Sequence, residues 1–278
     1  MEIWAHTLVK NEARWLWYSV SSVINNVDKL LLWDTGSTDM SIGIEEDLLK
    51  AYPNKIIYRQ RRQDTAHDFA IVRQEILDET KSDWFVMLDG DEIWWKDSIN
   101  KVIKTIHSDH DLESIVVPTI NVVGDIFHFQ NKSAGRYNLA GRVGHYNLRG
   151  INRNIPGLRS LGSHGVWGWA DGDGKMIQNR AVEKIRFVDA PYIHTTFLHR
   201  GGLGNADKLV IKRSRKYKHE IGNSFPSDYF YPEVLFENRP KNIPSPWGVS
   251  DLSFKARSYI ETPLRQIKRK IWIGKTGY

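Results

Sequence analysis

The sequence predicts an α/β protein with a doubly wound, mostly parallel sheet flanked by helices. Short apolar runs alternate with helix-like segments over the first 120 of the 278 residues, and the joining loops are short. Clusters of polar residues follow the apolar runs. Parallel strands bring their carboxyl ends to one edge of a sheet, where folds of this class bind their ligands.

The first half is expected to hold four short buried strands, at Ile3–Val9, Lys29–Trp33, Lys55–Arg59 and Trp84–Leu88. Helices are expected between them, over 13–27, 41–51 and 68–79. Apolar residues recur at helical spacing in the first helix, and Asn11 is expected to cap it. The small polar cluster Asp34–Asp39 offers capping residues for the second helix.

The stretch after the fourth strand carries the strongest chemical signal, because it reads Asp89, Gly90, Asp91 and Glu92. Three carboxylates in four positions repel one another, so leaving them unpaired is costly. Carboxylate oxygens are the ligands that hard divalent cations prefer, and Gly90 permits a sharp turn and the close approach of a ligand. We therefore expect a metal site here. The alternative is a solvated turn or a helix cap after a core strand.

The second half follows a different pattern. Its expected elements are a helix over 98–107, a strand over 114–120, short strands and long loops over 121–185, strands over 185–188 and 192–197, a basic helix over 205–220, and a proline-rich surface wrap over 222–254. The change of pattern divides the chain into three regions, 1–120, 121–220 and 221–278.

Composition narrows the function classes. The chain has no cysteine, which excludes disulfides, zinc–thiolate sites and cysteine nucleophiles. It shows no apolar run near the roughly 18 residues of a membrane span and no signal-peptide pattern. Segment 255–278 has seven Lys or Arg and one Glu, a net charge of +6 that equals that of the whole chain. The neutral body argues against nucleic-acid binding, and we expect a cytoplasmic protein, peripheral on the inner face of a membrane.

Four motifs carry a resemblance to a known family: LVKNEARWL at 8–16, WDTGSTD at 33–39, FAIVRQEIL at 69–77 and WFVMLDGDE at 84–92. In this order and spacing they resemble the family 2 glycosyltransferases, which are inverting, nucleotide-sugar-dependent enzymes with the GT-A fold. The resemblance implies that region 1–120 binds the nucleotide-sugar. It implies that 121–220 is the acceptor-binding and catalytic half of the same domain, and that 221–278 is a C-terminal wrap with a basic tail.

The resemblance also implies roles for individual residues. Asp91, helped by Asp89, would hold Mn²⁺ or Mg²⁺ against the diphosphate of a UDP- or GDP-sugar. Asp89 would also reach the ribose, and Asp34 would accept a hydrogen bond from the base or ribose. Thr7 and Glu12, at the end of the first strand, would line the nucleoside pocket.

Further roles follow for residues of later segments. Arg73 would fix Asp34 or the diphosphate. The alternative for Asp34 and Arg73 is a buried ion pair without ligand contact. A third metal ligand in this fold is often a late histidine, which makes His194 the first candidate and His199 the second. The alternative is a hydrogen-bonded core histidine. His164 is expected to be a surface or loop residue.

The general base of the transfer is usually an Asp or Glu on a loop before the final strand of this family. Asp171 and Asp173 occupy such a place, although the usual Glu-Asp pair is absent. The alternative is a Gly-Asp turn in an acceptor loop. Trp167 and Trp169 are expected to offer a stacking platform for an acceptor sugar.

The basic tail is expected to approach a lipid surface. Leu264, Ile267, Ile271 and Trp272 are spaced like one face of a helix, and basic residues surround them. This pattern suits a helix on an anionic membrane, where lipid-linked acceptors are found. The alternatives are a solvated helix and a disordered tail.

The expected function is a metal-dependent glycosyltransferase that moves a sugar from a nucleotide-diphosphate donor to a glycan or lipid-linked acceptor. A nucleotidyltransferase is the nearest alternative, but that class carries a Gly-rich basic loop after its first strand, and LVKNEARW has no glycine. A non-catalytic nucleotide- or sugar-binding module is the second alternative. The missing Glu-Asp pair keeps it open.

Overall fold

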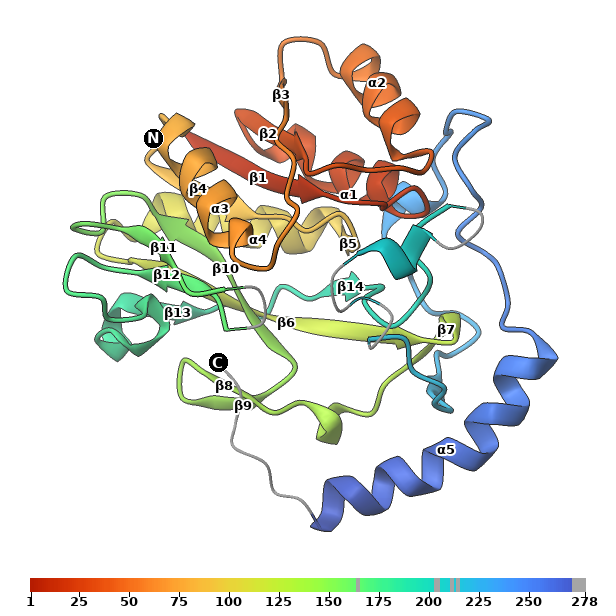
Figure 1. Cartoon of the computed structure of the whole chain (residues 1–278). Coiled ribbons are helices and arrows are strands. Elements are labelled where there is room, and N and C mark those ends of the chain that lie inside the picture. Colours follow the sequence, from red (N-terminus) through yellow and green to blue (C-terminus); the bar gives the residue numbers. More distant parts are fainter. Residues whose placement is uncertain (164–165, 203–205, 211–212, 214–215, 272–278) are drawn as a thin grey trace.

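The structure of the protein is a computed structural model that describes residues 1–163, 166–202, 206–210, 213 and 216–271. A curled sheet with the strand order β15-β7-β6-β10-β4-β1-β2-β3 forms its centre, and helices cover both faces (Figure 1). The α-helices are α1 Leu16–Val23, α2 Ser41–Ala51, α3 Asp68–Glu79, α4 Lys96–Ser108 and α5 Leu252–Ile271. The described 3₁₀ turns are η1 Ile24–Asn26, η2 Lys132–Ala134, η3 Ile177–Asn179, η4 Val182–Lys184, η5 Ala206–Leu209 and η7 Glu233–Leu235.

The strands fall into two groups. The first half supplies β1 Ile3–Val9, β2 Lys29–Asp34, β3 Ile56–Gln60, β4 Trp84–Met87 and β5 Glu92–Trp94. The second half supplies β6 Ser114–Val123, β7 Asp125–Phe129, β8 Tyr137–Leu139, β9 Arg142–Gly144, β10 Tyr146–Asn152, β11 Arg159–Leu161, β12 Gly168–Ala170, β13 Ile185–Phe187, β14 Tyr192–His194 and β15 Asn223–Ser224. Both halves therefore build one central sheet.

The first half is doubly wound, as predicted. Strands β4, β1, β2 and β3 are neighbours and run parallel. Helix α3 covers one face, where Val72 and Ile76 pack with Trp4 and Leu31. Helices α1 and α2 share the core on the opposite face. Apolar strands buried on both sides explain why unbroken hydrophobic runs marked this half of the chain.

The second half adds antiparallel strands that the sequence pattern did not predict. Strand β10 lies between β4 and β6 and runs antiparallel to both. Strand β14 pairs with β6 and with β5, which places His194 opposite Glu92. The strand expected over 192–197 ends at His194, because the Thr195 amide turns to the Asp91 carbonyl at 2.9 Å.

Two predicted helices differ from the observed ones. The helix expected over 205–220 is present, among the described residues, only as the short turn η5. Side chains of this segment, including Asp207 and Arg213, instead contact the ends of distant strands and loops. Helix α5 begins inside the predicted surface wrap and continues through Pro263 to Ile271. Trp272 of the expected tail helix lies outside the described residues.

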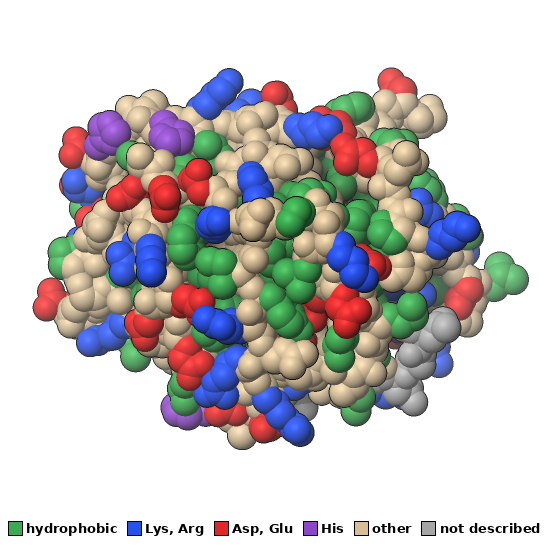
Figure 2. All heavy atoms as spheres, turned by 90° about the horizontal axis from the view of Figure 1, so that it is seen from above, with side chains coloured by type: hydrophobic (Ala, Val, Ile, Leu, Met, Phe, Trp, Pro, Cys, Tyr) green, Lys and Arg blue, Asp and Glu red, His purple; other side chains and the backbone are tan. Residues whose placement is uncertain are grey.

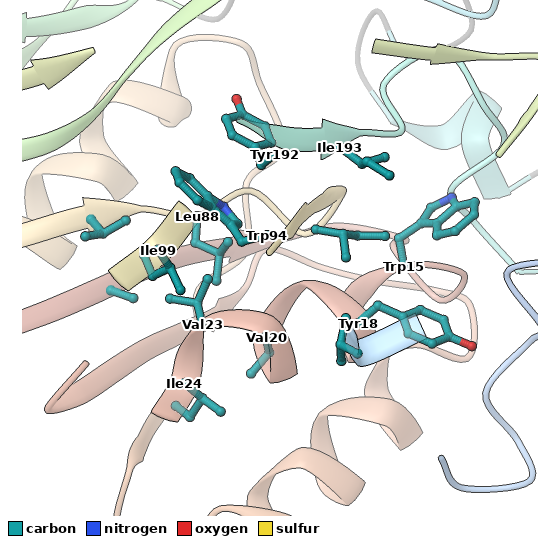
Figure 3. Close-up of a cluster of buried hydrophobic side chains, with 14 of the residues drawn as sticks. Trp15, Tyr18, Val20, Val23, Ile24, Leu88, Trp94, Ile99, Tyr192 and Ile193 are labelled. Carbon is teal, nitrogen blue, oxygen red and sulfur yellow. The ribbon is translucent and has the colours of Figure 1, made fainter. Parts of the chain in front are cut away.

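The turn after β4 rests on a rigid apolar cluster (Figure 3). The rings of Trp94 and Tyr192 stack with centroids 4.7 Å apart, beside the buried face of α1. Helix α1 also supports the turn by hydrogen bonds: the Ser19 hydroxyl donates to the Asp89 carbonyl at 2.8 Å, and the Trp94 amide donates to the Ser22 hydroxyl at 3.2 Å. This packing fixes the backbone from which the acidic side chains project.

Helix α2 carries a buried carboxyl group that predicts a pH effect on stability. Glu45 is 1% exposed, and the Tyr58 hydroxyl donates to its Oε2 at 2.9 Å. Burial, and then the Asp34 carboxylate, raise the pKa of Glu45 from 4.5 to about 8. The folded state therefore keeps a proton that the unfolded state loses above pH 4.5, so stability declines as the pH rises toward 8.

We expect Glu45→Gln to remove this decline, which is worth a few kcal/mol at about 1.4 kcal/mol per pKa unit. Urea unfolding at pH 5 to 9 measures it. The exposed neighbour Glu46, changed to Gln, is the matched control. Parallel pH profiles of wild type and Glu45→Gln would contradict a neutral Glu45.

Candidate functional site

The carboxyl ends of β1 and β2 are tied together by hydrogen bonds between their loops. Asn11 has a φ of 56°, and its amide donates to the Ser37 hydroxyl at 2.9 Å. The Thr38 amide donates to Asn11 Oδ1 at 2.7 Å, and the Glu12 amide donates to the Ser41 hydroxyl at 2.8 Å. Asn11 is therefore not the predicted helix cap, since its side chain bridges two loops and α1 begins only at Leu16.

Asp89 lies at the end of β4 between two arginines. Arg73 of α3 donates to its Oδ1 at 3.0 Å, and Arg149 of β10 lies 3.4 Å from its Oδ2. Burial opposes ionisation of Asp89, but Arg149 and Arg73 outweigh it and keep the pKa of this carboxyl below its ordinary value. The side chain remains 36% exposed, so it faces open space as well as its partners.

Asp91 is fully buried and makes different contacts. Its Oδ2 contacts the Arg200 guanidinium and lies 3.3 Å from His194 Nε2, whereas its Oδ1 has no hydrogen-bond partner. Burial alone would raise the pKa of Asp91. The positive charge of Arg200 and then the contact with His194 outweigh burial, and they hold the pKa well below its ordinary value. Asp91 is therefore a buried carboxylate with one oxygen that has no hydrogen-bond partner.

Glu12 completes the acidic group from the end of β1. It is 4% exposed, contacts Arg213, and lies 3.4 Å from Arg200. Burial raises the pKa of Glu12 to about 7 against the opposing effect of Arg200 and Arg213. A Cβ atom at Gly90 would lie 3.0 Å from Glu12 Cγ, so glycine lets the two loops approach.

The segment after β14 covers this edge of the sheet. Its Arg200 carbonyl accepts from the Arg14 amide at 2.9 Å, and its Gly202 amide donates to Asp39 Oδ2 at 2.9 Å. Arg213 also reaches back and donates to the Asn11 carbonyl at 2.5 Å. These contacts explain how side chains about 190 residues apart in the sequence meet at one site.

The sequence did not predict three site residues, Arg149, Arg200 and Arg213, whereas Glu92 belongs to the predicted acidic turn. Glu92 is fully buried and contacts Arg149, a residue in the middle of a buried strand. Arg200 and Arg213 face the acidic side chains from the covering segment. An arginine inside the buried strand β10 requires a buried anion as partner, because an uncompensated buried charge is costly.

The acidic side chains fit a divalent cation in part. Asp91 Oδ1 is an unpartnered carboxylate oxygen, and His194 lies beside it with 16% exposure. Carboxylate and imidazole together are a donor set for Mn²⁺. Asp89, however, is turned to Arg73 and Arg149. Within the described part of the chain, no three His, Asp or Glu side chains converge as a metal site.

The nucleoside candidates are placed as follows. Asp34 ends β2 and accepts from the Ser37 amide at 3.0 Å, as a turn-capping carboxylate does. Arg73 pairs with Asp89, so the alternative of an Asp34–Arg73 ion pair is wrong. Thr7 is fully buried inside β1. Its hydroxyl has no hydrogen-bond partner, and its burial places it behind any pocket surface.

Asp171 and Asp173 are not near the acidic side chains, which corrects their prediction as the general base. Asp171 accepts from the Asp173 amide at 3.1 Å and contacts Arg180, which also binds Glu113. The Glu113 carbonyl accepts from the Asn152 amide, and Asn152 pairs with the first residue of β4. The Asp171 turn therefore lies at the end of the sheet opposite Asp89, as the predicted Gly-Asp turn.

The two tryptophans and the second histidine are also placed by the structure. Trp169 is 2% exposed and packs on Phe85 and Met87, so it is a core residue rather than a stacking platform. Trp167 lies 5.3 Å from the Arg73 guanidinium, at the edge of the site. His199 is directed to Asp207 at 3.1 Å and away from Asp91. His164 lies outside the described residues.

Comparisons with known proteins agree with this architecture. The family model described as Glycosyl transferase family 2 matches residues 6–165, more than half of the chain. No curated protein gives a sequence match. Similar solved structures include TarS of S. aureus, with 14% identity and a TM-score of 0.47 over 71% of this chain. The match spans 37% of the length of TarS.

Two further solved structures are similar over part of the chain. Glucosyl-3-phosphoglycerate synthase from Mycobacterium tuberculosis, in complex with Mn²⁺ and UDP-glucose, shares 16% identity at a TM-score of 0.42. That match covers 69% of this chain and 71% of the synthase. The mannosyltransferase PcManGT from Pyrobaculum calidifontis, in complex with GDP-Man and Mn²⁺, shares 14% identity at a TM-score of 0.39. That match covers 55% of this chain and 45% of PcManGT.

Proposed function

This chain belongs to glycosyl transferase family 2, and we propose that it transfers a sugar from a nucleoside-diphosphate donor to a glycan or lipid-linked acceptor. One observation carries the proposal. The buried Asp91 carboxylate contacts His194 and Arg200 through one oxygen and has no hydrogen-bond partner for the other, at the carboxyl edge of the parallel strands. This edge is where folds with a parallel sheet bind their ligands.

The chemistry of the leaving group explains the charges of the site. A nucleoside diphosphate departs with negative charge, which must be neutralised for the glycosidic bond to break. Arg149, Arg200 and Arg213 provide fixed positive charge at this edge. A bound Mn²⁺ or Mg²⁺ would add Lewis-acid stabilisation of the diphosphate, held by Asp91 and His194 with help from Asp89.

The protein's own groups prepare the site for an anionic ligand. Arg200 and Asp91 neutralise each other in the ligand-free structure, so neither buried charge is left alone. We propose that the donor diphosphate draws Arg200 toward its phosphate oxygens and so frees Asp91 for the metal. Arg73 and Arg149 hold Asp89 from two sides, and they orient it at the mouth of the site.

The neighbouring strand ends are the proposed place of the nucleoside. Asp34 and Glu12 lie at the carboxyl ends of β2 and β1, next to the acidic turn after β4. We assign Asp34 to the base or ribose and Glu12 to the wall of the pocket. The displacement is proposed to invert the anomeric carbon, as the family resemblance implies.

A thermal-shift screen of nucleoside diphosphates and their sugars, with and without Mn²⁺, tests this function. A ligand that binds only the folded state raises the melting temperature. At a hundred times its Kd it adds roughly 2.7 kcal/mol to the free energy of unfolding. We expect UDP or GDP, together with Mn²⁺, to raise the melting temperature. The variant Asp173→Asn, altered at an exposed turn away from the site, should respond like wild type. A response to nucleoside triphosphates alone would favour the nucleotidyltransferase alternative and contradict the proposal.

A further inference from the structure

Helix α5 lies along the outside of the molecule and carries two opposite faces (Figure 1). The side that faces the body is pinned by polar contacts. The Thr262 hydroxyl accepts from the Ile221 amide at 2.8 Å, and Arg269 binds both oxygens of Glu220 at 2.6 and 2.7 Å. Phe254 anchors the first turn against Tyr217. Together these contacts fix which side of the helix points outward.

The outward side is apolar. Six of its large side chains are between 53% and 84% exposed: Leu252, Tyr259, Ile260, Leu264, Ile267 and Ile271. They recur every three or four residues after Tyr259, so they form one stripe on the helix. The residues of the packed side, Phe254, Ser258 and Thr262, are each at most 7% exposed. A stripe of this size on a soluble surface marks an interaction site.

Cations flank the apolar stripe. Lys255, Arg257 and Lys268 are exposed on the same helix, while the segment 255–278 holds a net charge equal to that of the whole chain. On the face shown in Figure 2, acidic and basic side chains are interspersed. Within the described residues, no helix is long and apolar enough to cross a bilayer.

We propose that α5 docks on the surface of an anionic phospholipid membrane, with its axis in the interfacial plane and its apolar stripe among the upper acyl chains. The charge decides between the possible occupants. A second copy of the chain would bring its own flanking cations against these cations, which is repulsive, whereas anionic headgroups neutralise them. An apolar face bordered by Lys and Arg is the composition of an interfacial helix. This proposal does not depend on the transferase activity.

Co-sedimentation of the full chain with vesicles tests the proposal. The probes are phosphatidylcholine vesicles with and without about 30% phosphatidylserine. We expect binding to the anionic vesicles only, and a loss of at least about tenfold in the partition coefficient when Ile260→Ser and Leu264→Ser are combined. These changes leave the net charge unaltered, and Gln266→Ser is the matched control at an exposed polar position of the same helix.

Two further measurements distinguish membrane docking from misfolding of the variant and from dimer formation. The combined variant should melt at the wild-type temperature, because both side chains are exposed. Replacing Lys255 and Arg257 by Gln should weaken binding to the anionic vesicles, and added salt should do the same. Equal binding of wild type and the Ile260/Leu264 variant would overturn the proposal. Light scattering could also overturn it, by showing that the wild-type protein is a dimer that does not bind vesicles and that the Ile260/Leu264 variant is a monomer.

Discussion

Replacing Asp91 by asparagine is expected to lower the rate of donor turnover by about a thousandfold while leaving the fold intact. The amide lacks the charge that a divalent ion requires, and loss of a Lewis acid in the transition state is worth several kcal/mol. Arg200 still has Glu12 at 3.4 Å as a neighbour, which it shares with Arg213. Hydrolysis or transfer from the donor identified by the thermal-shift screen measures the effect.

The control for this variant is Asp173→Asn, which alters an exposed carboxylate at the opposite end of the sheet. Its turnover should equal that of wild type. A far-UV spectrum and a melting curve establish that the Asp91 variant is folded. Near-normal turnover by folded Asp91→Asn would remove the metal role from this residue.

Replacing Arg200 by leucine is expected to lower the free energy of unfolding by about 3–5 kcal/mol. The change removes the guanidinium that contacts the buried Asp91, whereas Glu12 keeps Arg213, and an uncompensated buried charge costs this much. Adding Asp91→Asn to the same chain should recover part of the loss, because the charge left without its guanidinium disappears. Urea unfolding of the single and double variants measures both effects.

The same variant also reports on the metal. If a divalent ion binds Asp91, Mn²⁺ should stabilise Arg200→Leu more than wild type, since the ion replaces the missing positive charge. The exposed arginine Arg62, paired with Asp64 at the surface, gives the matched control when changed to leucine, and it should alter stability little. An Arg200→Leu protein as stable as wild type at every Mn²⁺ concentration would contradict a stabilising role of the buried ion pair between Arg200 and Asp91.

The fold of the first half followed from local patterns. Strands β1, β2 and β4 are buried on both faces, so their sequences are mostly apolar runs, and α3 has the predicted bounds. Asp89, Asp91 and Glu12 come to one edge because parallel strands share the direction of their carboxyl ends. His194 lies beside Asp91 because β14 returns to the sheet, and its role as a metal ligand stays a prediction.

The rest of the site depends on contacts that no local pattern contains. Arg200 and Arg213 reach Glu12 from positions about 190 residues later in the chain. Arg149 arrives on β10, whose insertion between β4 and β6 has no signature in its own sequence. Asp171 has the residue types of a catalytic loop, but its hydrogen bonds to the Asp173 and Lys175 amides are those of a tight turn. Composition alone does not distinguish these two uses.

We propose that Asp91 binds a divalent ion together with the diphosphate of the donor. The most direct measurement is a titration of Mn²⁺ into the wild-type protein and the Asp91→Asn variant, followed by electron paramagnetic resonance of the free ion, with and without the nucleoside diphosphate. We predict a bound ion in the wild type that requires the nucleotide and is lost in the variant. Equal Mn²⁺ uptake by both proteins, or nucleotide binding unchanged in excess chelator, would contradict the claim.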